Sequence, residues 1–124
     1  MTCLFLYSNI GILEMDLAPE LLLRLADRFA ALADVHRLRL LMTLKEGPSR
    51  VADLVAVSGL AQSSVSKHLT VLRHAGLVAV ERIGNEAHYA VRDVTLFQLC
   101  DLVCGAVRAQ VAAEAEAIAA LPAQ

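Results

Sequence analysis

The stretch "GLAQSSVSKHLTVLRHAGLV", residues 59–78, decides the fold. Its middle predicts a helix from about Gln62 to Ala75, which Gly76 ends. At about 100° per residue, one side of this helix is apolar and forms a core face: Val65, Leu69 and Leu72. The opposite side gathers hydroxyls, a lysine and a histidine, with no acidic residue among them: Ser63, Lys67, Thr70 and His74. Ser64 and Ser66 lie on the flanks of this polar side, and His68 borders the core face.

A polar face of this kind suits entry into a DNA major groove. Short side chains allow close approach, and hydroxyls and amides can meet phosphates or base edges. The alternative is a solvent-exposed polar face that binds no partner. The elements on either side of the helix decide between the two, because they predict a known DNA-binding arrangement.

Three helices are expected before residue 62. The first runs from Pro19 to Ala33, with a stripe at Leu22, Leu25, Phe29 and Leu32. Asp34 caps the second, Val35 to Lys45, whose stripe is Leu38, Leu41 and Met42. Ser49 caps a short third helix that ends near Val57.

After residue 76 the spacing of the apolar residues changes from a helical period to alternation. Apolar residues alternate on both sides of Gly84-Asn85, which predicts a two-stranded hairpin with these residues at its tip. A long last helix follows from about Val94 to Leu121. The predicted fold is mainly α with a small β-hairpin wing, a winged helix-turn-helix.

The composition indicates that the chain packs against a second copy of itself, and the charge distribution indicates a polyanionic partner. The chain has 124 residues, enough for one domain, and 57% of them are hydrophobic but only 4% aromatic. A small monomer cannot bury so much aliphatic surface. The net charge is −2, yet residues 36–92 carry eight basic and four acidic side chains. A basic middle between acidic ends favours contact with nucleic acid.

Other features favour a cytoplasmic protein without catalysis. No apolar run is expected to be long enough to span a membrane, and residues 3–13 make a poor signal peptide. Three cysteines do not suggest a secreted disulfide framework. No phosphate loop, nucleophile–base pair or paired carboxylates point to an enzyme. A protein-interaction module without DNA binding remains an alternative.

The chain resembles the ArsR/SmtB family of bacterial metal- and stress-sensing repressors. Three segments carry the resemblance: "LADVHRLRLLMTL" (32–44), residues 59–78, and the wing "ERIGNEAHYAV" (81–91). The resemblance covers roughly residues 20–112. It implies a homodimeric repressor that binds double-stranded DNA at an inverted-repeat operator and dimerises through its first and last helices. One departure is Ala61, where the family usually has a capping serine, at a cost of about 1 kcal/mol.

The family-like domain spans residues 19–121, after an N-terminal extension of residues 1–18. Met15 offers an alternative start, and residues 1–14 are expected to be dispensable for DNA binding. The apolar residues of the extension favour the opposite view, that it packs on the dimer.

The expected DNA contacts combine the polar helix with the wing: Gln62, Ser63, Ser64, Ser66, Lys67, His68, Thr70, Arg82 and Asn85. Gln62 is the best candidate to read a base and Arg82 to bind a phosphate. His88 lies near the wing, and Tyr89 is expected to pack. Arg37 is as well placed for an intramolecular ion pair as for a phosphate.

The inducer is the open question. The family's Cys-x-Cys site would lie on the third helix, which reads "RVADLVAV" and contains no cysteine. The four ligand positions of the family's zinc site on the last helix correspond to Asp93, Thr95, Ala106 and Ala109, of which only Asp93 could bind a metal. Cys100 and Cys104, four apart on one helix, remain a candidate site for a soft metal, an arsenical such as arsenite, or an oxidant. The alternative is that both cysteines only pack, because they continue an apolar stripe with Phe97, Val107 and Val111.

Overall fold

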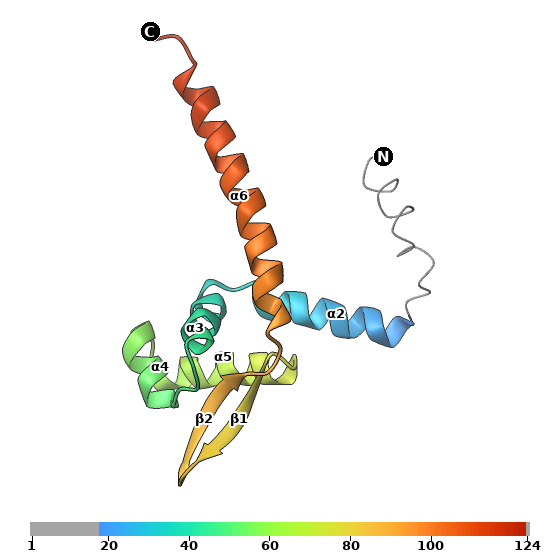
Figure 1. Cartoon of the computed structure of the whole chain (residues 1–124), viewed down its shortest axis with the longest axis vertical. Helices are drawn as coiled ribbons and strands as arrows, with labels where there is room; N and C mark the ends of the chain where they lie inside the picture. The colour runs from blue at the N-terminus through green and yellow to red at the C-terminus, as the bar shows by residue number, and fades with distance from the viewer. Residues whose placement is uncertain (1–17, 124) are drawn as a thin grey trace.

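A computed structural model describes residues 18–123. Its elements follow the order α2 (Pro19–Leu32), α3 (Val35–Lys45), α4 (Val51–Ser58), α5 (Gln62–His74), β1 (Val78–Ile83), β2 (Glu86–Val91) and α6 (Thr95–Ala119) (Figure 1). The predicted winged helix-turn-helix is confirmed, with most element ends within two residues of expectation. The extension of residues 1–18 lies, apart from its last residue, outside the described part of the chain.

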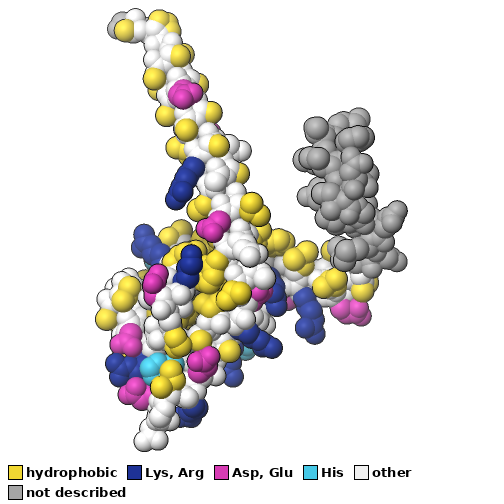
Figure 2. Space-filling model, viewed as in Figure 1, with side chains coloured by type: hydrophobic (Ala, Val, Ile, Leu, Met, Phe, Trp, Pro, Cys, Tyr) yellow, Lys and Arg dark blue, Asp and Glu magenta, His cyan; other side chains and the backbone are white. Residues whose placement is uncertain are grey.

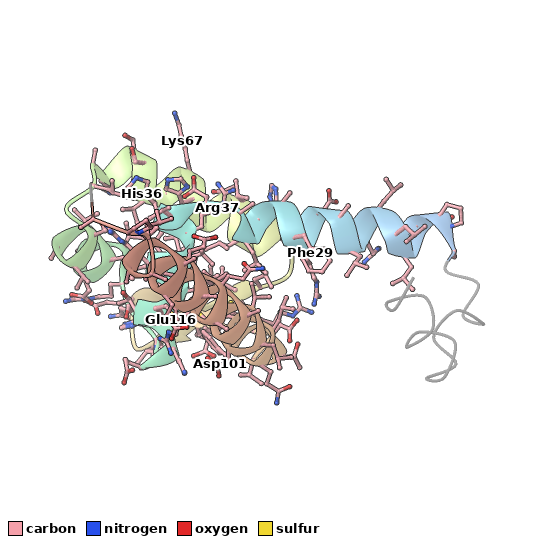
Figure 3. All side chains as sticks on the ribbon, turned by 90° about the horizontal axis from the view of Figure 1, so that it is seen from above. Phe29, His36, Arg37, Lys67, Asp101 and Glu116 are labelled. Atoms are coloured by element: carbon pink, nitrogen blue, oxygen red, sulfur yellow. The ribbon has the colours of Figure 1, made fainter. Side chains whose placement is uncertain are left out.

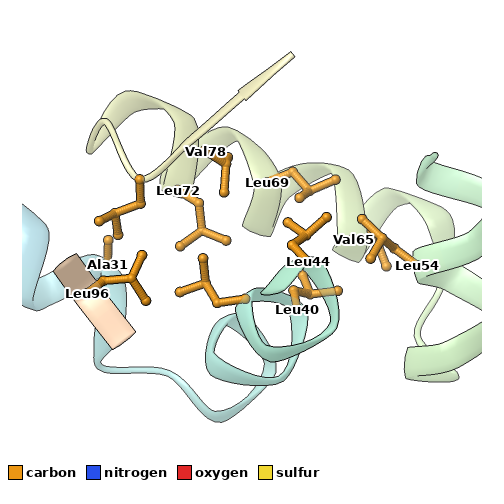
Figure 4. Close-up of a cluster of buried hydrophobic side chains, with 11 residues drawn as sticks. Ala31, Leu40, Leu44, Leu54, Val65, Leu69, Leu72, Val78 and Leu96 are labelled. Carbon is orange, nitrogen blue, oxygen red and sulfur yellow. The ribbon is translucent and has the colours of Figure 1, made fainter. Parts of the chain in front are cut away.

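The core joins the helix-turn-helix to the wing. Val65, Leu69 and Leu72 of α5 are fully buried, which confirms the predicted core face. They meet buried side chains of α2, α3, α4, the turn before β1, β1 itself and the first turn of α6: Ala31, Leu40, Leu41, Leu44, Leu54, Leu77, Val78 and Leu96 (Figure 4). This packing fixes α5 on the body, so that its polar side is left for other contacts.

The predicted stripe of α3 is wrong in two of its three members. Leu41 is buried, but the other buried residues are Leu40 and Leu44, whereas Met42 is 43% exposed and Leu38 is only partly buried. Helix α3 is apolar on two sides, and the packing of α4 and α5 decides which side is covered. Val35, Leu38 and Met42 line an open hollow on the other side.

Ser49 does not cap the third helix as predicted. Its backbone pairs with Tyr89 of β2, Ser49 N donating to the Tyr89 carbonyl at 3.0 Å and Tyr89 N to the Ser49 carbonyl at 2.8 Å. Helix α4 begins two residues later, and Arg50 N donates to Asp53 Oδ2 at 3.3 Å. Gly59 then ends α4 with a φ of +70°, a left-handed conformation that suits glycine.

The wing is an antiparallel pair that runs from Val78 opposite Val91 to Ile83 opposite Glu86. Gly84, with a φ of +65°, and Asn85 form the tip, as predicted. Because Arg92 N donates to the Leu77 carbonyl at 2.9 Å, the end of the wing is tied to the turn that follows α5. The hairpin extends away from the body on the side opposite α6 (Figure 1).

The two terminal helices leave much of their apolar surface open. Helix α6 packs on the core through Leu96, Phe97 and Cys100, and every residue from Asp101 to Ala119 is exposed. On α2, Leu22 is 48% exposed and Phe29 is 49% exposed. Both helices project from the body, α2 sideways and α6 away from the wing (Figure 1).

Helix α6 also corrects the expectation about membrane-length segments. Among the described residues it is the one helix long and apolar enough to cross a membrane, with 25 residues and a mean hydropathy of 1.3 in its best window. This is weak evidence for a membrane helix. The same apolar surface is what a helix needs at an interface between subunits.

Candidate nucleic-acid interface

The polar side of α5 faces outward. Ser63, Ser66, Lys67, Thr70 and His74 are exposed, as is Gln62 at the first position of the helix. Ser64, on the flank, is partly buried. Lys67 points away from the body at the edge of the molecule (Figure 3). The two turns of α5 that begin at Gln62 therefore present small donors, acceptors and one cation on an open surface.

The Thr70 hydroxyl has a second role inside the helix. Its Oγ1 donates to the Ser66 carbonyl at 2.9 Å, so the hydroxyl proton is already used. The oxygen still has lone pairs that can accept a hydrogen bond from an amino group of a base. Lys67, by contrast, has no ion-pair partner in the part of the chain that the structure describes.

The start of α5 lacks a side-chain cap. Ala61 is the N-cap residue, with extended backbone angles and no side chain to accept a hydrogen bond. Free N–H groups at a helix start carry a partial positive charge and attract anions such as phosphate. The first turn of α5 contains no acidic residue.

His68 is tied to the interior. It is partly buried, its ring centroid lies 5.8 Å from that of His36, and its Nδ1 is 3.5 Å from Arg37 Nη1. Arg37 forms no ion pair among residues 18–123, and its contact with a phosphate stays a prediction. Its Nε donates to the Ala31 carbonyl at 2.6 Å and its Nη2 to the Ala30 carbonyl at 3.1 Å, at the end of α2. Sequence reasoning missed this role because the carbonyls belong to another helix.

The wing exposes Arg82 and Asn85, one on β1 and one at the tip. Arg82 has no ion pair among residues 18–123, which leaves its guanidinium available. Tyr89 packs against the core, as predicted.

An ionic group that the sequence reading missed holds the wing to α4. Arg50 pairs with Asp53 at 3.1 Å and with Glu86 of β2 at 3.2 Å. The hydrogen bond from Arg50 lowers the pKa of the Asp53 carboxyl. Glu86 also lies 3.5 Å from His88 Nε2, so His88 faces this group rather than the open surface. Arg50 and Glu86 are 36 residues apart in sequence, so no local pattern could reveal the contact that joins α4 to the wing.

Asp93, the one remaining match to the family's last-helix zinc site, has other partners. It accepts hydrogen bonds from Thr95 at the start of α6 and forms an ion pair with Arg28 of α2. Among the described residues, no group of three His, Cys, Asp or Glu side chains could hold a metal ion.

Cys100 and Cys104 lie one turn apart on α6 but differ in surroundings. Cys100 is partly buried and packs against the core, whereas Cys104 is exposed. Burial raises the pKa of the Cys100 thiol, and Cys104 and Asp101 raise it further. A raised pKa keeps the thiol protonated near neutral pH and makes it a weak nucleophile. Among residues 18–123, no third His, Cys, Asp or Glu side chain completes a metal site with this pair.

Comparisons with known proteins agree with this geometry. A family profile described as "Bacterial regulatory protein, arsR family" matches residues 34–80. The chain is 41% identical over 78 residues to the HTH-type transcriptional regulator NmtR of Mycobacterium tuberculosis, covering 63% of this chain and 65% of NmtR. It is 36% identical over 75 residues to the arsenical resistance operon repressor of Bacillus subtilis, covering 60% of this chain and 71% of that protein.

Solved structures share the fold. The homodimeric winged helix-turn-helix DNA-binding domain of a possible ArsR-family regulator from Mycobacterium bovis aligns with a TM-score of 0.67 at 28% identity. The alignment covers 75% of this chain and 86% of that domain. The matches to the first two curated relatives span only 65% and 59% of the relatives' own length.

Proposed function

Because this chain belongs to the arsR family of bacterial regulatory proteins, we propose that it is a homodimeric repressor that binds an inverted-repeat operator in the cytoplasm and leaves it when an inducer binds. The observation that carries the proposal is the two-sided α5. Val65, Leu69 and Leu72 are fully buried, while Ser63, Lys67 and Thr70 are open and free of acidic neighbours on that face.

The dimer is proposed from the uncovered terminal helices. Helix α6 exposes one large apolar side chain after another, with Val103 at 54%, Val107 at 49% and Val111 at 58%. Helix α2 adds Leu25 and Phe29. Exposed apolar surface of this extent marks an interface, and two-fold symmetry would set two α5 helices about 34 Å apart, one turn of DNA.

Sedimentation at micromolar concentration tests the dimer. A dimer is expected, and Phe29→Glu together with Val107→Glu should produce monomers by placing charges in the interface. Arg24→Glu, on the polar side of α2, is the matched control and should remain dimeric. A parent chain that sediments as a monomer would refute this part of the proposal.

The DNA surface combines α5 with the wing. We expect Ser63, Ser64, Ser66, Lys67, His68 and Thr70 to lie in or beside the major groove, with Asn85 at the wing tip. Lys67 and Arg82 supply charge, so Lys67→Ala and Arg82→Ala should each weaken binding and flatten its salt dependence. His68 serves best by positioning, since Arg37 and His36 hold its ring.

Fluorescence anisotropy with the DNA upstream of the protein's own gene tests this surface. Arg108→Ala is the control, since it removes one exposed arginine from α6, far along the chain from α5. Gln62→Ala should act differently, because a lost amide contact reduces discrimination between bases more than overall affinity. Parent-like binding by all three variants, Lys67→Ala, Arg82→Ala and Gln62→Ala, would mean that the DNA surface lies elsewhere.

We propose Cys100 and Cys104 as the inducer site, acted on by a soft metal, trivalent arsenic or a thiol oxidant. The supporting observation is that Cys104 is exposed on the helix assigned to the dimer interface, one turn from Cys100. An inducer there would act by changing how the subunits are set against each other, which needs a coupling free energy of only about 1–3 kcal/mol. Thiolates favour soft ions over a hard ion such as magnesium.

Arsenite titrated into the repressor–DNA complex tests the site. Release is expected from the parent and not from the double variant Cys100→Ser, Cys104→Ser, which should keep its DNA affinity. Magnesium is the control ion. If the double variant releases DNA like the parent, the cysteines only pack and the inducer acts elsewhere.

A further inference from the structure

Four arginines line a polar hollow at the junction of α2, α5 and the wing. Arg24 and Arg28 come from α2, Arg73 from the end of α5, and Arg92 from the residue after β2. We call this the arginine hollow. Asp27 is the one acidic side chain that lines it, so its lining has a formal excess of three positive charges. This concentration is notable in a chain whose net charge is −2.

Backbone contacts join the end of α5 to the wing, and the Arg28 side chain of α2 reaches this junction. Gly76, with a φ of +78°, turns the chain after α5, and its N–H donates to the Arg73 carbonyl at 3.0 Å. Arg92 N reaches the Leu77 carbonyl at 2.9 Å. A Cβ on Gly76 would lie 3.3 Å from Arg28 Nη2, so the glycine leaves room for the guanidinium. The arrangement is therefore fixed by the fold.

Three of the four guanidinium groups are not neutralised. Arg28 pairs with Asp93, but no ion pair in the part of the chain described involves Arg24, Arg73 or Arg92. All three side chains are exposed. Converging guanidinium groups without carboxylate partners favour a phosphate, which they bind through several N–H donors.

The hollow adjoins the proposed DNA surface. His74 lines it and lies on the same outward side of α5 as Lys67 and Thr70. Lys and Arg side chains gather along the lower side of α2, between that helix and the wing (Figure 2). A duplex lying along the outward side of α5 would thus bring its backbone to the hollow at the end of the helix.

We propose that Arg24, Arg73 and Arg92 bind the sugar–phosphate backbone of DNA beside the bases that α5 reads. This inference rests on the proposed function, since it takes α5 as the reading helix. Backbone contacts position a protein on DNA without reading sequence. Because α2 also belongs to the proposed dimer interface, the two hollows of a dimer would secure the DNA between the half-sites.

The test uses a random-sequence duplex of about 40 base pairs, because phosphate contacts do not depend on sequence. Anisotropy titrations at several salt concentrations give the slope of log K against log salt. Arg73→Gln and Arg92→Gln each remove one contact per subunit and should make the negative slope shallower by about 2 in the dimer, with affinity falling about 3- to 10-fold or more. Arg108→Gln changes the net charge equally, lies on α6, and should leave the slope unchanged.

The outcomes separate this inference from the proposed function. If Lys67→Ala makes the salt slope shallower but Arg73→Gln and Arg92→Gln do not, the inference is wrong and the proposed function stands. If these variants become monomers in sedimentation, the arginines serve the subunit interface and the inference is also wrong. Saturable binding of inorganic phosphate with unchanged DNA slopes would assign the hollow to a free anion instead. A parent chain that binds no duplex would refute both proposals.

Discussion

Arg37 joins His68 to the end of a different helix. Its Nη1 lies 3.5 Å from His68 Nδ1 on α5, while its Nε and Nη2 donate to two carbonyls at the end of α2. Helix α2 carries part of the proposed dimer interface and α5 the proposed reading face. One side chain of α3 thus contacts both helices.

Arg37→Ala should lower the free energy of unfolding by about 1.5–3 kcal/mol, because it removes charged hydrogen bonds to helix-end carbonyls. Urea unfolding measures the change. Arg39→Ala is the matched control on the same helix, since the Arg39 side chain is exposed. Equal stability of the two variants would show that the carbonyl contacts contribute nothing.

Ala61→Ser should stabilise the protein. A serine hydroxyl at this N-cap position can accept from a free N–H of the first turn of α5, a contact that Ala61 cannot make. A gain of about 0.5–2 kcal/mol is expected in urea unfolding. Ala56→Ser, at an exposed position within α4, lacks this geometry and should give no gain. The prediction fails if the cap serine is no more stable than the parent.

Leu69→Ala should cost about 2–5 kcal/mol, because it leaves a cavity in a fully buried site. Val71→Ala on the same helix is the comparison. Val71 is 41% exposed, so its truncation removes little buried surface. Calorimetry should therefore find a large fall in Tm for the first variant and a small one for the second. Similar falls would contradict the assigned core face.

Stability on the acid side should depend on Asp93. Hydrogen bonds from Thr95, with the charge of Arg28, hold the pKa of this carboxyl below its ordinary value of 3.8. A lowered folded-state pKa gives stability that is present above 3.8 and is lost as the pH falls through the lowered value. Asp93→Asn should thus lose stability at neutral pH and show a shallower loss on acidification.

Unfolding measured at a series of pH values checks this. The loss of stability on acidification will not vanish in the variant, because two other carboxyls have lowered pKa values. Backbone hydrogen bonding from Arg37 lowers the pKa of Asp34, and a hydrogen bond from Arg50 lowers that of Asp53. Parallel curves for parent and variant would show that Asp93 is not linked to folding.

The local sequence pattern was sufficient to predict the helices and strands and the orientation of α5. Its apolar residues fall on a single side, so only one rotation buries them, and Val65, Leu69 and Leu72 are buried as predicted. The Gly84-Asn85 tip was equally clear, because a hairpin turn depends on adjacent residues. For the same reason Asp34 was recognisable as a cap, and it accepts from His36 N at 2.9 Å and Arg37 N at 3.0 Å.

The errors arose where distant residues compete. Helix α3 has apolar residues on two sides, and only the positions of α4 and α5 select Leu40 and Leu44 over Leu38 and Met42. Ser49 has the chemistry of a cap, but pairing with Tyr89, 40 residues away, engages its backbone instead. The arginine hollow escaped notice for the same reason, since its four arginines are spread between residues 24 and 92.

The exposed length of α6 has a consequence for how the molecule responds to dilution. From Asp101 to Ala119 the helix rests on nothing else in the described chain, and most helical stability in proteins comes from the packing of an apolar face. Its helicity should therefore depend on the proposed partner subunit, and so on protein concentration. Far-ultraviolet circular dichroism should lose helical signal on dilution while the buried core around Leu69 stays folded, making the helix itself a reporter of assembly.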